Sequence, residues 1–502
     1  MTYDPQKPSY YLNPTHYPLH GTGTVLNDPA TLEPVGVFGQ PTEDEIDSVL
    51  LRVNAAQKGW GAMDAKSRAQ ALHRVASAIE DTDMSTVAKL MTLETGKPYP
   101  ESIGEIANIP AVFRYYAELA RHDGGKVAGT MQPGSFQYQI VEPYGVSVHV
   151  VPYNFPLILG CWTIAASLAA GNGIVLKASP IGTLCTMEFM QVFAALPDDL
   201  IACLPGDGGV GKHLIASKMT HAVAFTGSVE TGRAVAIAAA SAMKPAVIEA
   251  GGNDACIVSK HADIAVAAAG CVTASFLQSG QVCTSTERVF VVDEVYDAFL
   301  DAFVARTKQL RIGNGLEVAE IGPLVSQAAR TKVMALVEDA RSKGATIAIG
   351  GEIPSEHPTG WFYAPTILTD VTDAMDVLHS EAFGPVVSIV RVKDFDEAIT
   401  RANDSDFGLG ACLFTNDLAE AFEGVNRLEA GMVWVNNPLV DNDALPFGGI
   451  KNSGLGRSLS GQGLESFRRA KMAVIDPKAK QADWWYPYPD DWFYSSTGRS
   501  HS

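Results

Sequence analysis

The residue best suited to covalent chemistry is Cys283, within the segment GQVCTSTERVFV (280–291). It follows a loop that contains glycine and precedes a valine-rich stretch that predicts a strand. Such a loop could present the thiol at a cleft, where its thiolate would act as a nucleophile. The alternative is a buried structural cysteine, because most free cysteines in folded proteins serve only as packing.

A second candidate is Glu249, at the end of the apolar run in VIEAGGNDACIV (247–258). A carboxylate at the end of a strand is well placed for general-base work. Gly251 and Gly252 would let a ligand approach the backbone closely. The alternative is a carboxylate that lies in solvent at the end of a strand.

Two further segments follow predicted strands. In FTGSVETGR (225–233), Gly227 and Gly232 lie at a spacing that suits a phosphate at a helix N-terminus, although a plain strand-to-helix turn fits equally well. In VPYNFPLILG (151–160), the amide of Asn154 could donate a hydrogen bond to a developing oxyanion. The alternative for Asn154 is a turn residue whose side chain satisfies the backbone.

The composition excludes several classes of protein. The formal net charge of −19 over 502 residues disfavours nucleic acid and anionic lipid as partners. Hydrophobic residues make up 47%, enough for large cores. The seven cysteines form no CxxC pair, so we expect neither a disulfide framework nor a metal site. We find no signal peptide and no transmembrane run, and we expect a cytoplasmic protein without a membrane partner.

The elements that must position these residues alternate along the chain. From about residue 144, short β-branched runs alternate with helical runs, which predicts a parallel, doubly wound sheet. Residues 42–120 are predicted to be mostly helical, and a second α/β stretch runs from about 252 to 450. Residues 129–143 are predicted to be extended, and the C-terminal tail is unusually aromatic.

Together these segments resemble the aldehyde dehydrogenase superfamily. The resemblance runs in order over nearly the whole chain, through LETGKP (93–98), PYNFP (152–156), LKASP (176–180), FTGSVETGR (225–233), EAGGN (249–253), GQVCT (280–284), EAFGPV (381–386) and PFGGIKNSGLGR (446–457). It implies an aldehyde dehydrogenase-like α/β fold. That fold combines a doubly wound Rossmann-type cofactor domain, an α/β catalytic domain and a small β oligomerisation extension.

The resemblance implies oxidation of an aldehyde to the acid with NAD or NADP, through a thioester on Cys283. Asn154 and the main-chain N–H of Cys283 would hold the oxyanion, and Glu249 would activate water. Cofactor contacts are implied for Lys177, Ser179, Gly227, Ser228, Gly251, Glu381 and Phe383.

The substrate side follows from the same resemblance. The pocket is expected to involve Leu159, Trp162, Val282, Thr284 and Asp441. Asp441 and Asp443 would lie near a tunnel where relatives for apolar aldehydes carry aromatic residues, so we expect a polar substrate, such as an aminoaldehyde or a semialdehyde. A solvated loop at the tunnel rim is the alternative.

Two positions depart from the family pattern. Tyr153 replaces a common tryptophan. Pro180 replaces a common glutamate that pairs with the adenosine 2′-hydroxyl and repels a 2′-phosphate. NADP is therefore not excluded, and we expect NAD with a slight preference.

The resemblance also divides the chain. It assigns 1–128 with 144–251 to the dinucleotide-binding domain and 252–452 to the catalytic domain. It assigns 129–143 with 453–502 to the oligomerisation extension and tail, which predicts a homodimer or homotetramer.

Three competing readings remain. One is a CoA-acylating dehydrogenase of the same fold, which the retained Glu249 and the absence of arginine at Val282 argue against. Another is a catalytically silent binding protein. The third is a thiol hydrolase that needs no cofactor, for which the sequence offers no evident histidine base.

Overall fold

The computed structural model describes residues 3–20, 23–122, 124–131, 133–482 and 484–490. The chain divides into two compact units. The first comprises Met1–His122 and Pro143–Arg468, and the second Asp123–Glu142 and Arg469–Ser502.

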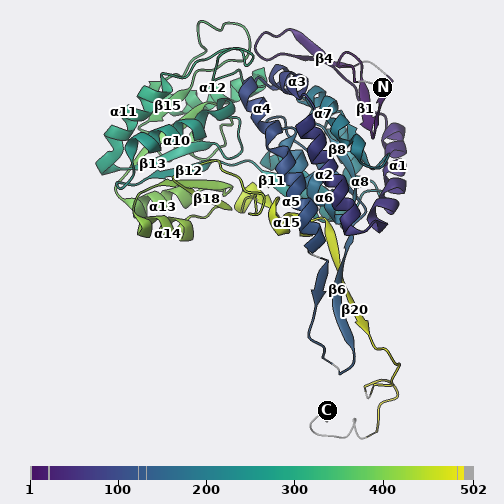
Figure 1. The fold of residues 1–502 in the computed structure, drawn as a ribbon. Coiled ribbons are helices and arrows are strands. Elements are labelled where there is room, and N and C mark those ends of the chain that lie inside the picture. The colour runs from purple at the N-terminus through teal and green to yellow at the C-terminus, as the bar shows by residue number, and fades with distance from the viewer. Residues whose placement is uncertain (1–2, 21–22, 123, 132, 483, 491–502) are drawn as a thin grey trace. The chain divides into compact units, whose positions relative to one another are not determined.

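An eight-stranded sheet forms one half of the first unit, in the order β19-β11-β10-β7-β8-β9-β1-β2 (Figure 1). Its five central strands pair in parallel: β7 (Val146–Val150), β8 (Gly173–Lys177), β9 (Ile201–Leu204), β10 (Ala222–Gly227) and β11 (Ala246–Ala250). Antiparallel pairs add the edges: β1 (Ser9–Leu12), β2 (Thr15–Pro18) and β19 (Gly454–Leu455). The chain leaves β7 toward β8 and β9 and later returns on its other side through β10 and β11. This sheet is therefore doubly wound, with a switch point between β7 and β10.

Helices cover both faces of this sheet. Val146, Val148 and Val175 pack with α1 (Glu43–Ala62) and α8 (Gly208–Ala216). The opposite face packs against α6 (Ile158–Ala170), whose residues from Leu159 onward are all buried. Helix α6 is in turn covered by other helices. The remaining helices of this half are α2 (Ala65–Asp81), α3 (Ser85–Thr95), α4 (Tyr99–Ala107), α5 (Ile109–His122), α7 (Thr183–Phe189), η1 (Met190–Ala195), α9 (Val229–Ser241) and α15 (Ser460–Glu465).

A seven-stranded sheet forms the other half, in the order β14-β15-β16-β13-β12-β17-β18. Its strands are β12 (Asp254–Val258), β13 (Thr286–Val292), β14 (Thr346–Ile349), β15 (Thr366–Thr369), β16 (Val386–Val392), β17 (Gly410–Phe414) and β18 (Met432–Val435). All neighbours are parallel except β14 and β15. The five inner strands are buried almost throughout, as expected when helices cover both faces of a parallel sheet, whereas the edge strands β14 and β18 are partly exposed.

The helices of this half divide between the two faces. One core contains residues of α10 (Ile264–Phe276) and α11 (Tyr296–Thr307). The other contains residues of α12 (Gln327–Ser342) and α13 (Phe395–Asn403). Shorter elements complete the first unit: β3 (Thr24–Asn27), β4 (Pro34–Phe38), η2 (Leu277–Gly280), η3 (Asp293–Val295), η4 (Asp376–Leu378), α14 (Leu418–Arg427) and η5 (Lys451–Ser453).

The second unit is built around a three-stranded sheet, ordered β20-β6-β5. Its strands are β5 (Gly125–Val127), β6 (Phe136–Pro143) and β20 (Arg468–Ile475). Residues 453–468, expected in the extension, belong to the first unit, because β19 pairs with β11 and α15 packs on α6. No helix within the described ranges has the length and apolarity needed to cross a membrane.

Candidate active site

A cavity of about 440 Å³ opens at the carboxyl ends of β7, β10 and β11. This is the switch point, where doubly wound sheets bind their ligands. Ten residues singled out by the sequence line it: Asn154, Leu159, Ser179, Gly227, Ser228, Glu249, Gly251, Cys283, Glu381 and Phe383. Residues far apart along the chain are thus brought to one cavity.

The backbone that leads to Cys283 is strained. Gln278, Ser279 and Gly280 have φ values of 49°, 58° and 73°, in the left-handed region that residues other than glycine rarely adopt. Hydrogen bonds hold this turn, including one from Ser279 Oγ to the Gly322 carbonyl at 2.9 Å. Strained turns of this kind concentrate at functional sites. The turn places the half-buried Cys283 on the cavity wall.

The surroundings of Cys283 favour the protonated form of its thiol. Burial raises its pKa well above the ordinary value, and nearby negative charges raise it further, from Glu249, Asp254, Asp441 and Glu381. A thiolate nucleophile here therefore needs a partner that accepts its proton.

Glu249 has the properties of such a partner. Its side chain is buried at the end of β11, and burial, with a smaller contribution from Asp441, raises the pKa of its carboxyl to about 7. Its Oε1 atom is buried without a hydrogen-bond partner. A carboxyl group with a pKa near neutrality, with a free oxygen beside a cavity, can accept a proton near pH 7.

Two hydrogen bonds with the turn before Cys283 hold Asn154 in place. Its side-chain Nδ2 donates to the main-chain carbonyl of Gln281 at 3.0 Å, and its main-chain carbonyl accepts from Gln278 Nε2 at 2.7 Å. An amide nitrogen carries two N–H groups, so one is left for a ligand in the cavity. The turn before Cys283 and the segment of Asn154 are thus linked directly.

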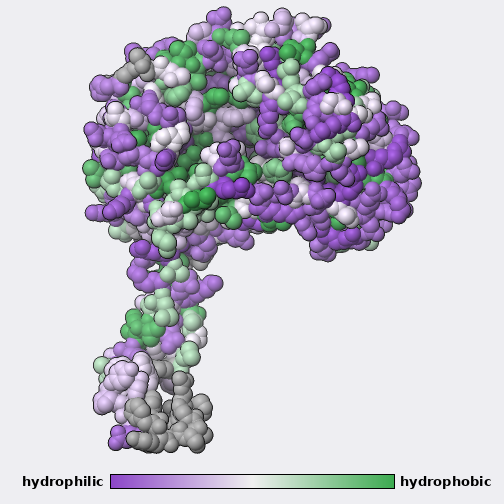
Figure 2. All heavy atoms as spheres, turned by 180° about the vertical axis from the view of Figure 1, so that it is seen from behind, coloured by the Kyte–Doolittle hydropathy of each residue, from purple (hydrophilic) through white to green (hydrophobic). Residues whose placement is uncertain are grey.

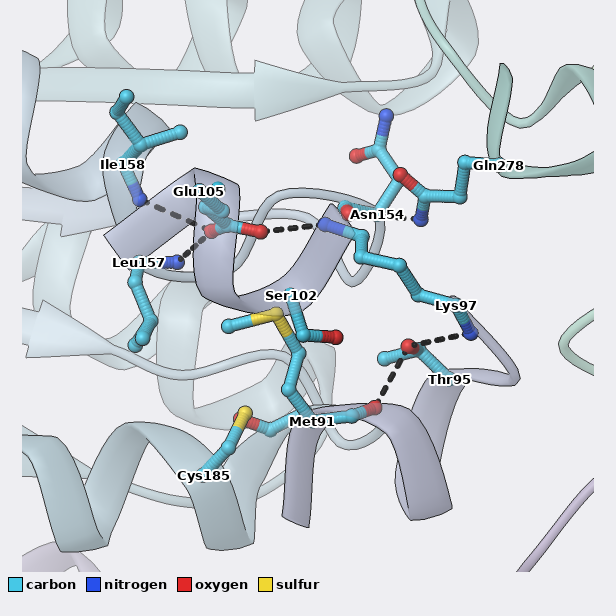
Figure 3. A network of polar contacts seen from close by, with 12 residues as sticks. Met91, Thr95, Lys97, Ser102, Glu105, Asn154, Leu157, Ile158, Cys185 and Gln278 are labelled. Carbon is cyan, nitrogen blue, oxygen red and sulfur yellow. Dashed lines mark hydrogen bonds and ion pairs between the residues drawn. The ribbon is translucent and has the colours of Figure 1, made fainter. Parts of the chain in front are cut away.

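A buried ion pair lies behind Asn154 (Figure 3). Lys97 Nζ binds Glu105 Oε2, and both side chains are fully buried. Glu105 Oε1 accepts the main-chain N–H groups of Leu157 and Ile158 at 2.9 and 3.1 Å. The pair therefore holds the backbone three residues beyond Asn154.

Of the residues expected on the cofactor side, all but Lys177 line the cavity. Ser228 caps α9, where its hydroxyl accepts the Thr231 N–H at 3.3 Å, so the helix N-terminus faces the cavity end of β10. Lys177 ends β8 without lining the cavity, and burial lowers the pKa of its ammonium to about 8. Glu381 accepts the Gly252 N–H at 3.1 Å. Its carboxyl has a pKa of about 8, raised first by burial and then by Glu287.

The residues expected on the substrate side are divided. Leu159 lines the cavity, whereas Trp162, Val282, Thr284 and Asp441 do not. Trp162 packs against Phe447, which does line it, with ring centroids 4.8 Å apart. Val282 and Thr284 are buried beside Cys283.

Asp441 is exposed, yet it lies close enough to act on the site. Desolvation by the surrounding protein, followed by the charge of Asp443, raises the pKa of Asp441 to about 6, so it is mostly ionised at pH 7. Its charge raises the pKa values of both Glu249 and Cys283. Asp441 therefore belongs to the electrostatic surroundings of the site although it does not line the cavity.

Two further side chains at the site differ in how far the sequence indicated them. Lys332, on α12, lines the cavity and lowers the pKa of Glu381. Tyr153 also lines it and packs edge-on against Phe383, with ring centroids 6.0 Å apart. The substitution of tyrosine in PYNFP pointed to Tyr153, but no sequence signal distinguishes Lys332 from other lysines on an exposed helical face.

Comparisons with known proteins agree with this architecture. The sequence profile of the aldehyde dehydrogenase family matches residues 20–473. A betaine aldehyde dehydrogenase of Rhizobium etli is 37% identical over 478 residues, which cover 93% of this chain and 97% of that protein. One of Brucella anthropi is 34% identical over 454 residues, covering 89% and 93%. A crystal structure of betaine aldehyde dehydrogenase from Staphylococcus aureus in complex with NAD+ superposes with a TM-score of 0.92 at 30% identity, covering 96% of this chain and 97% of that one.

Proposed function

Because the chain belongs to the aldehyde dehydrogenase family, we propose that it oxidises a polar, cationic aldehyde to the acid with NAD or NADP. Cys283 is the nucleophile, Glu249 the base and Asn154 the oxyanion donor. The observation that carries this proposal is that these three residues line one cavity at the switch point of a doubly wound sheet. A scaffold protein would need none of them there.

The cavity wall fits a dinucleotide. The N-terminus of α9 offers main-chain N–H groups for a pyrophosphate, with Gly227 and Ser228 beside it. A Cβ on Gly251 would lie 2.2 Å from Glu381 Oε1, so the glycine is required to keep that carboxyl on the wall. Lys177 and Glu381 would hold ribose hydroxyls, and Ser179 and Phe383 would contact the remainder. When bound, the nicotinamide accepts the hydride; the lean to NAD agrees with the NAD+ complex of the Staphylococcus aureus relative.

The residues of the chain divide the remaining work. Because burial and nearby carboxylates raise the pKa of the Cys283 thiol, its proton must leave as the sulfur–carbon bond to the aldehyde forms, and the unpartnered oxygen of Glu249 can accept it. The free N–H of Asn154 would stabilise the resulting alkoxide, and such a donor contributes roughly 3–4 kcal/mol. After hydride loss the carbonyl carbon is held on Cys283 as a thioester. Once Glu249 has released the thiol proton to solvent, it removes a proton from the water that attacks the thioester. As the carbon–sulfur bond breaks and the acid leaves, Glu249 returns this proton to the sulfur and the thiol is restored.

The proposed charge of the substrate rests on the electrostatics near the cavity. Asp441 and Asp443 add negative charge beside the already acidic surroundings of Cys283. A cationic aldehyde would gain Coulomb attraction there, and the aromatic ring of Phe447, which lines the cavity, adds a favourable face for a cation. The relatives in Rhizobium etli and Brucella anthropi are named for betaine aldehyde, whose head group is a quaternary ammonium.

A pair of substrates of equal shape tests this proposal. Betaine aldehyde and 3,3-dimethylbutanal differ by a quaternary nitrogen in place of a carbon. We expect the ratio of their kcat/KM values to favour betaine aldehyde strongly, and Asp441→Asn to reduce that ratio. Turnover of both substrates with an unchanged ratio would leave the enzyme assignment standing and refute the cationic substrate. No turnover of any aldehyde with either cofactor would refute the assignment itself.

The assembly and location of the protein are part of the proposal. The second unit exposes apolar side chains, notably Val127, Met131 and Met472. Figure 2 shows where hydrophobic residues reach the surface on one face of the molecule. Strand β18 ends its sheet, and Leu418 and Phe422 on the neighbouring α14 are exposed. Exposed apolar patches and sheet edges favour association, so we propose a homodimer or homotetramer, and a monomer mass in light scattering would refute it.

The domain roles and location stay predictions as well. We assign cofactor binding to 1–128 with 144–251, catalysis to 252–452, and assembly to 129–143 with the C-terminal segment. All seven cysteines are free thiols, which agrees with a reducing compartment such as the cytoplasm.

A further inference from the structure

The loop 380–384 brings three residues to the cavity wall, Glu381, Ala382 and Phe383. Phe383 has a φ of 51°, in the left-handed region, which is a genuine outlier for a bulky side chain. Such a conformation costs free energy and persists only where the surroundings over-determine it. Something in the structure must therefore hold this loop in place.

Glu287 supplies that restraint. It lies on β13 with only 2% of its surface exposed, and its two carboxyl oxygens accept consecutive main-chain N–H groups of the loop. Oε2 accepts from Ala382 and Oε1 accepts from Phe383, both at 2.9 Å. The two parallel bonds to one carboxyl group fix the orientation of two consecutive peptide groups, and the second of these directly precedes the strained φ of Phe383.

Asn253 braces the same carboxyl group. Its Nδ2 donates to Glu287 Oε2 at 2.7 Å and to the Ser380 carbonyl at 3.4 Å. From the neighbouring residue, the Gly252 N–H binds Glu381 Oε1 at 3.1 Å. The loop is thus held from two sides, by β13 and by the turn between β11 and β12. Neither Asn253 nor Glu287 lines the cavity.

We propose that Glu287 is a positioning residue for the nicotinamide cofactor: by binding the Ala382 and Phe383 N–H groups, it keeps Glu381 and Phe383 in their cofactor-binding arrangement. This inference rests on the proposed function, because it takes the wall formed by Glu381 and Phe383 as the cofactor site. Without the restraint, the loop relaxes from the strained conformation and only a fraction of the protein stays competent. The apparent dissociation constant then rises by the inverse of that fraction.

Glu287 also acts on Glu381 through its charge. Groups from three elements affect the Glu381 carboxyl: Glu287 on β13 raises its pKa, while Lys332 on α12 and the Gly252 N–H lower it. Asp254, buried nearby, also interacts with this carboxyl. Replacing Glu287 by a neutral residue removes the largest of these charge effects, so the pKa of Glu381 falls. The ionised carboxylate, the stronger acceptor for ribose hydroxyls, is then present at lower pH.

The test compares Glu287→Gln with Glu420→Gln in the purified full-length protein. The introduced glutamine offers one acceptor oxygen where the native glutamate offers two. Glu420 is a matched control in the same half of the first unit, and it does not line the cavity. Its half-buried carboxyl likewise accepts two hydrogen bonds, from the hydroxyl groups of Ser259 and Thr415. NAD+ binding is measured by calorimetry between pH 6 and 9, and the alkylation rate of Cys283 is measured without cofactor.

We expect Glu287→Gln to weaken NAD+ binding about tenfold, which corresponds to ~1.4 kcal/mol, and to shift the pH dependence of binding to lower pH. Cys283 alkylation should change little, and Glu420→Gln should bind NAD+ as the wild type does. An affinity within twofold of the wild type, with an unshifted pH profile, would overturn the inference. If Glu287→Gln does not fold, Asn253→Ala tests the inference instead, because it removes only the hydrogen bond that Asn253 donates to Glu287. This variant should weaken NAD+ binding about threefold. An unchanged affinity for NAD+ overturns the inference. A wild type that binds neither NAD+ nor NADP+ overturns the proposed function as well.

Discussion

Breaking the buried pair of Lys97 and Glu105 offers a quantitative test of how the Asn154 segment is held. Both side chains are fully buried, so Lys97→Met leaves the Glu105 carboxyl in the interior without its counter-charge. Stranding one partner of a buried ion pair typically costs about 3–5 kcal/mol. The variant also loses the contact of Lys97 Nζ with the Phe155 ring, at 4.0 Å from its centroid. We therefore expect a marked fall in stability.

The double variant Lys97→Met/Glu105→Gln separates charge from hydrogen bonding. The glutamine retains an oxygen that can accept the Leu157 and Ile158 N–H groups, and no unpaired charge remains. We expect it to be more stable than either single variant, with a coupling of about 3 kcal/mol or more in a double-mutant cycle. Urea-unfolding midpoints of the four proteins measure this coupling. Losses that simply add would refute the account of the pair.

The same variants connect this pair to catalysis. Glu105 holds the backbone just beyond Asn154, and a misplacement of about 1 Å can cost up to ~100-fold in rate. We expect Lys97→Met to lower kcat at least about tenfold while the NAD+ dissociation constant changes little. Steady-state rates combined with calorimetric NAD+ binding make the measurement. An unchanged kcat in the folded variant would show that the pair stabilises the fold without positioning Asn154.

Two further predictions follow from the geometry of the cavity. Because the pKa of Glu249 is about 7 and its base form is required, kcat should rise with pH through about 7 and level off above it; a flat profile from pH 6 to 8 would contradict the assigned base. Gly251→Ala would place a Cβ 2.2 Å from Glu381 Oε1, so NAD+ affinity measured by calorimetry should fall. Gly59→Ala is the matched control, since a Cβ there meets nothing within 4 Å, and equal affinities in the two variants would contradict the assignment.

Much of this architecture could be predicted, because many of the candidate site residues lie at the carboxyl ends of strands that the sequence indicates. The runs that end at Lys177, Gly227 and Glu249 form parallel strands, and their carboxyl ends converge at one edge of the sheet. The family and its fold are confirmed by the comparisons. The roles of the individual residues stay predictions, since a shared cavity wall does not establish what each side chain does.

Other features depend on contacts between distant segments. Strand β1 pairs Tyr11 with Cys203 at the sheet edge, a contact that no local pattern encodes. In the sequence, Glu287 directly precedes Arg288 in a valine-rich strand, a pattern that is typical of an ion pair at the protein surface. Only the fold brings it to Asn253 and Phe383. Contacts between distant segments determine where such side chains lie, and local sequence periodicity cannot predict those contacts.

The central claim, that the acyl group is carried on Cys283, is tested most directly by mass spectrometry of the trapped intermediate. Glu249→Gln slows loss of the thiol proton and also removes the base that activates water. A long incubation with NAD+ and betaine aldehyde, during which solvent takes up the thiol proton, followed by acid quench, should therefore leave an acyl mass on the peptide that contains Cys283. Glu249→Gln/Cys283→Ala should carry none. An adduct on another cysteine, or turnover to the acid by Cys283→Ala, would contradict the account.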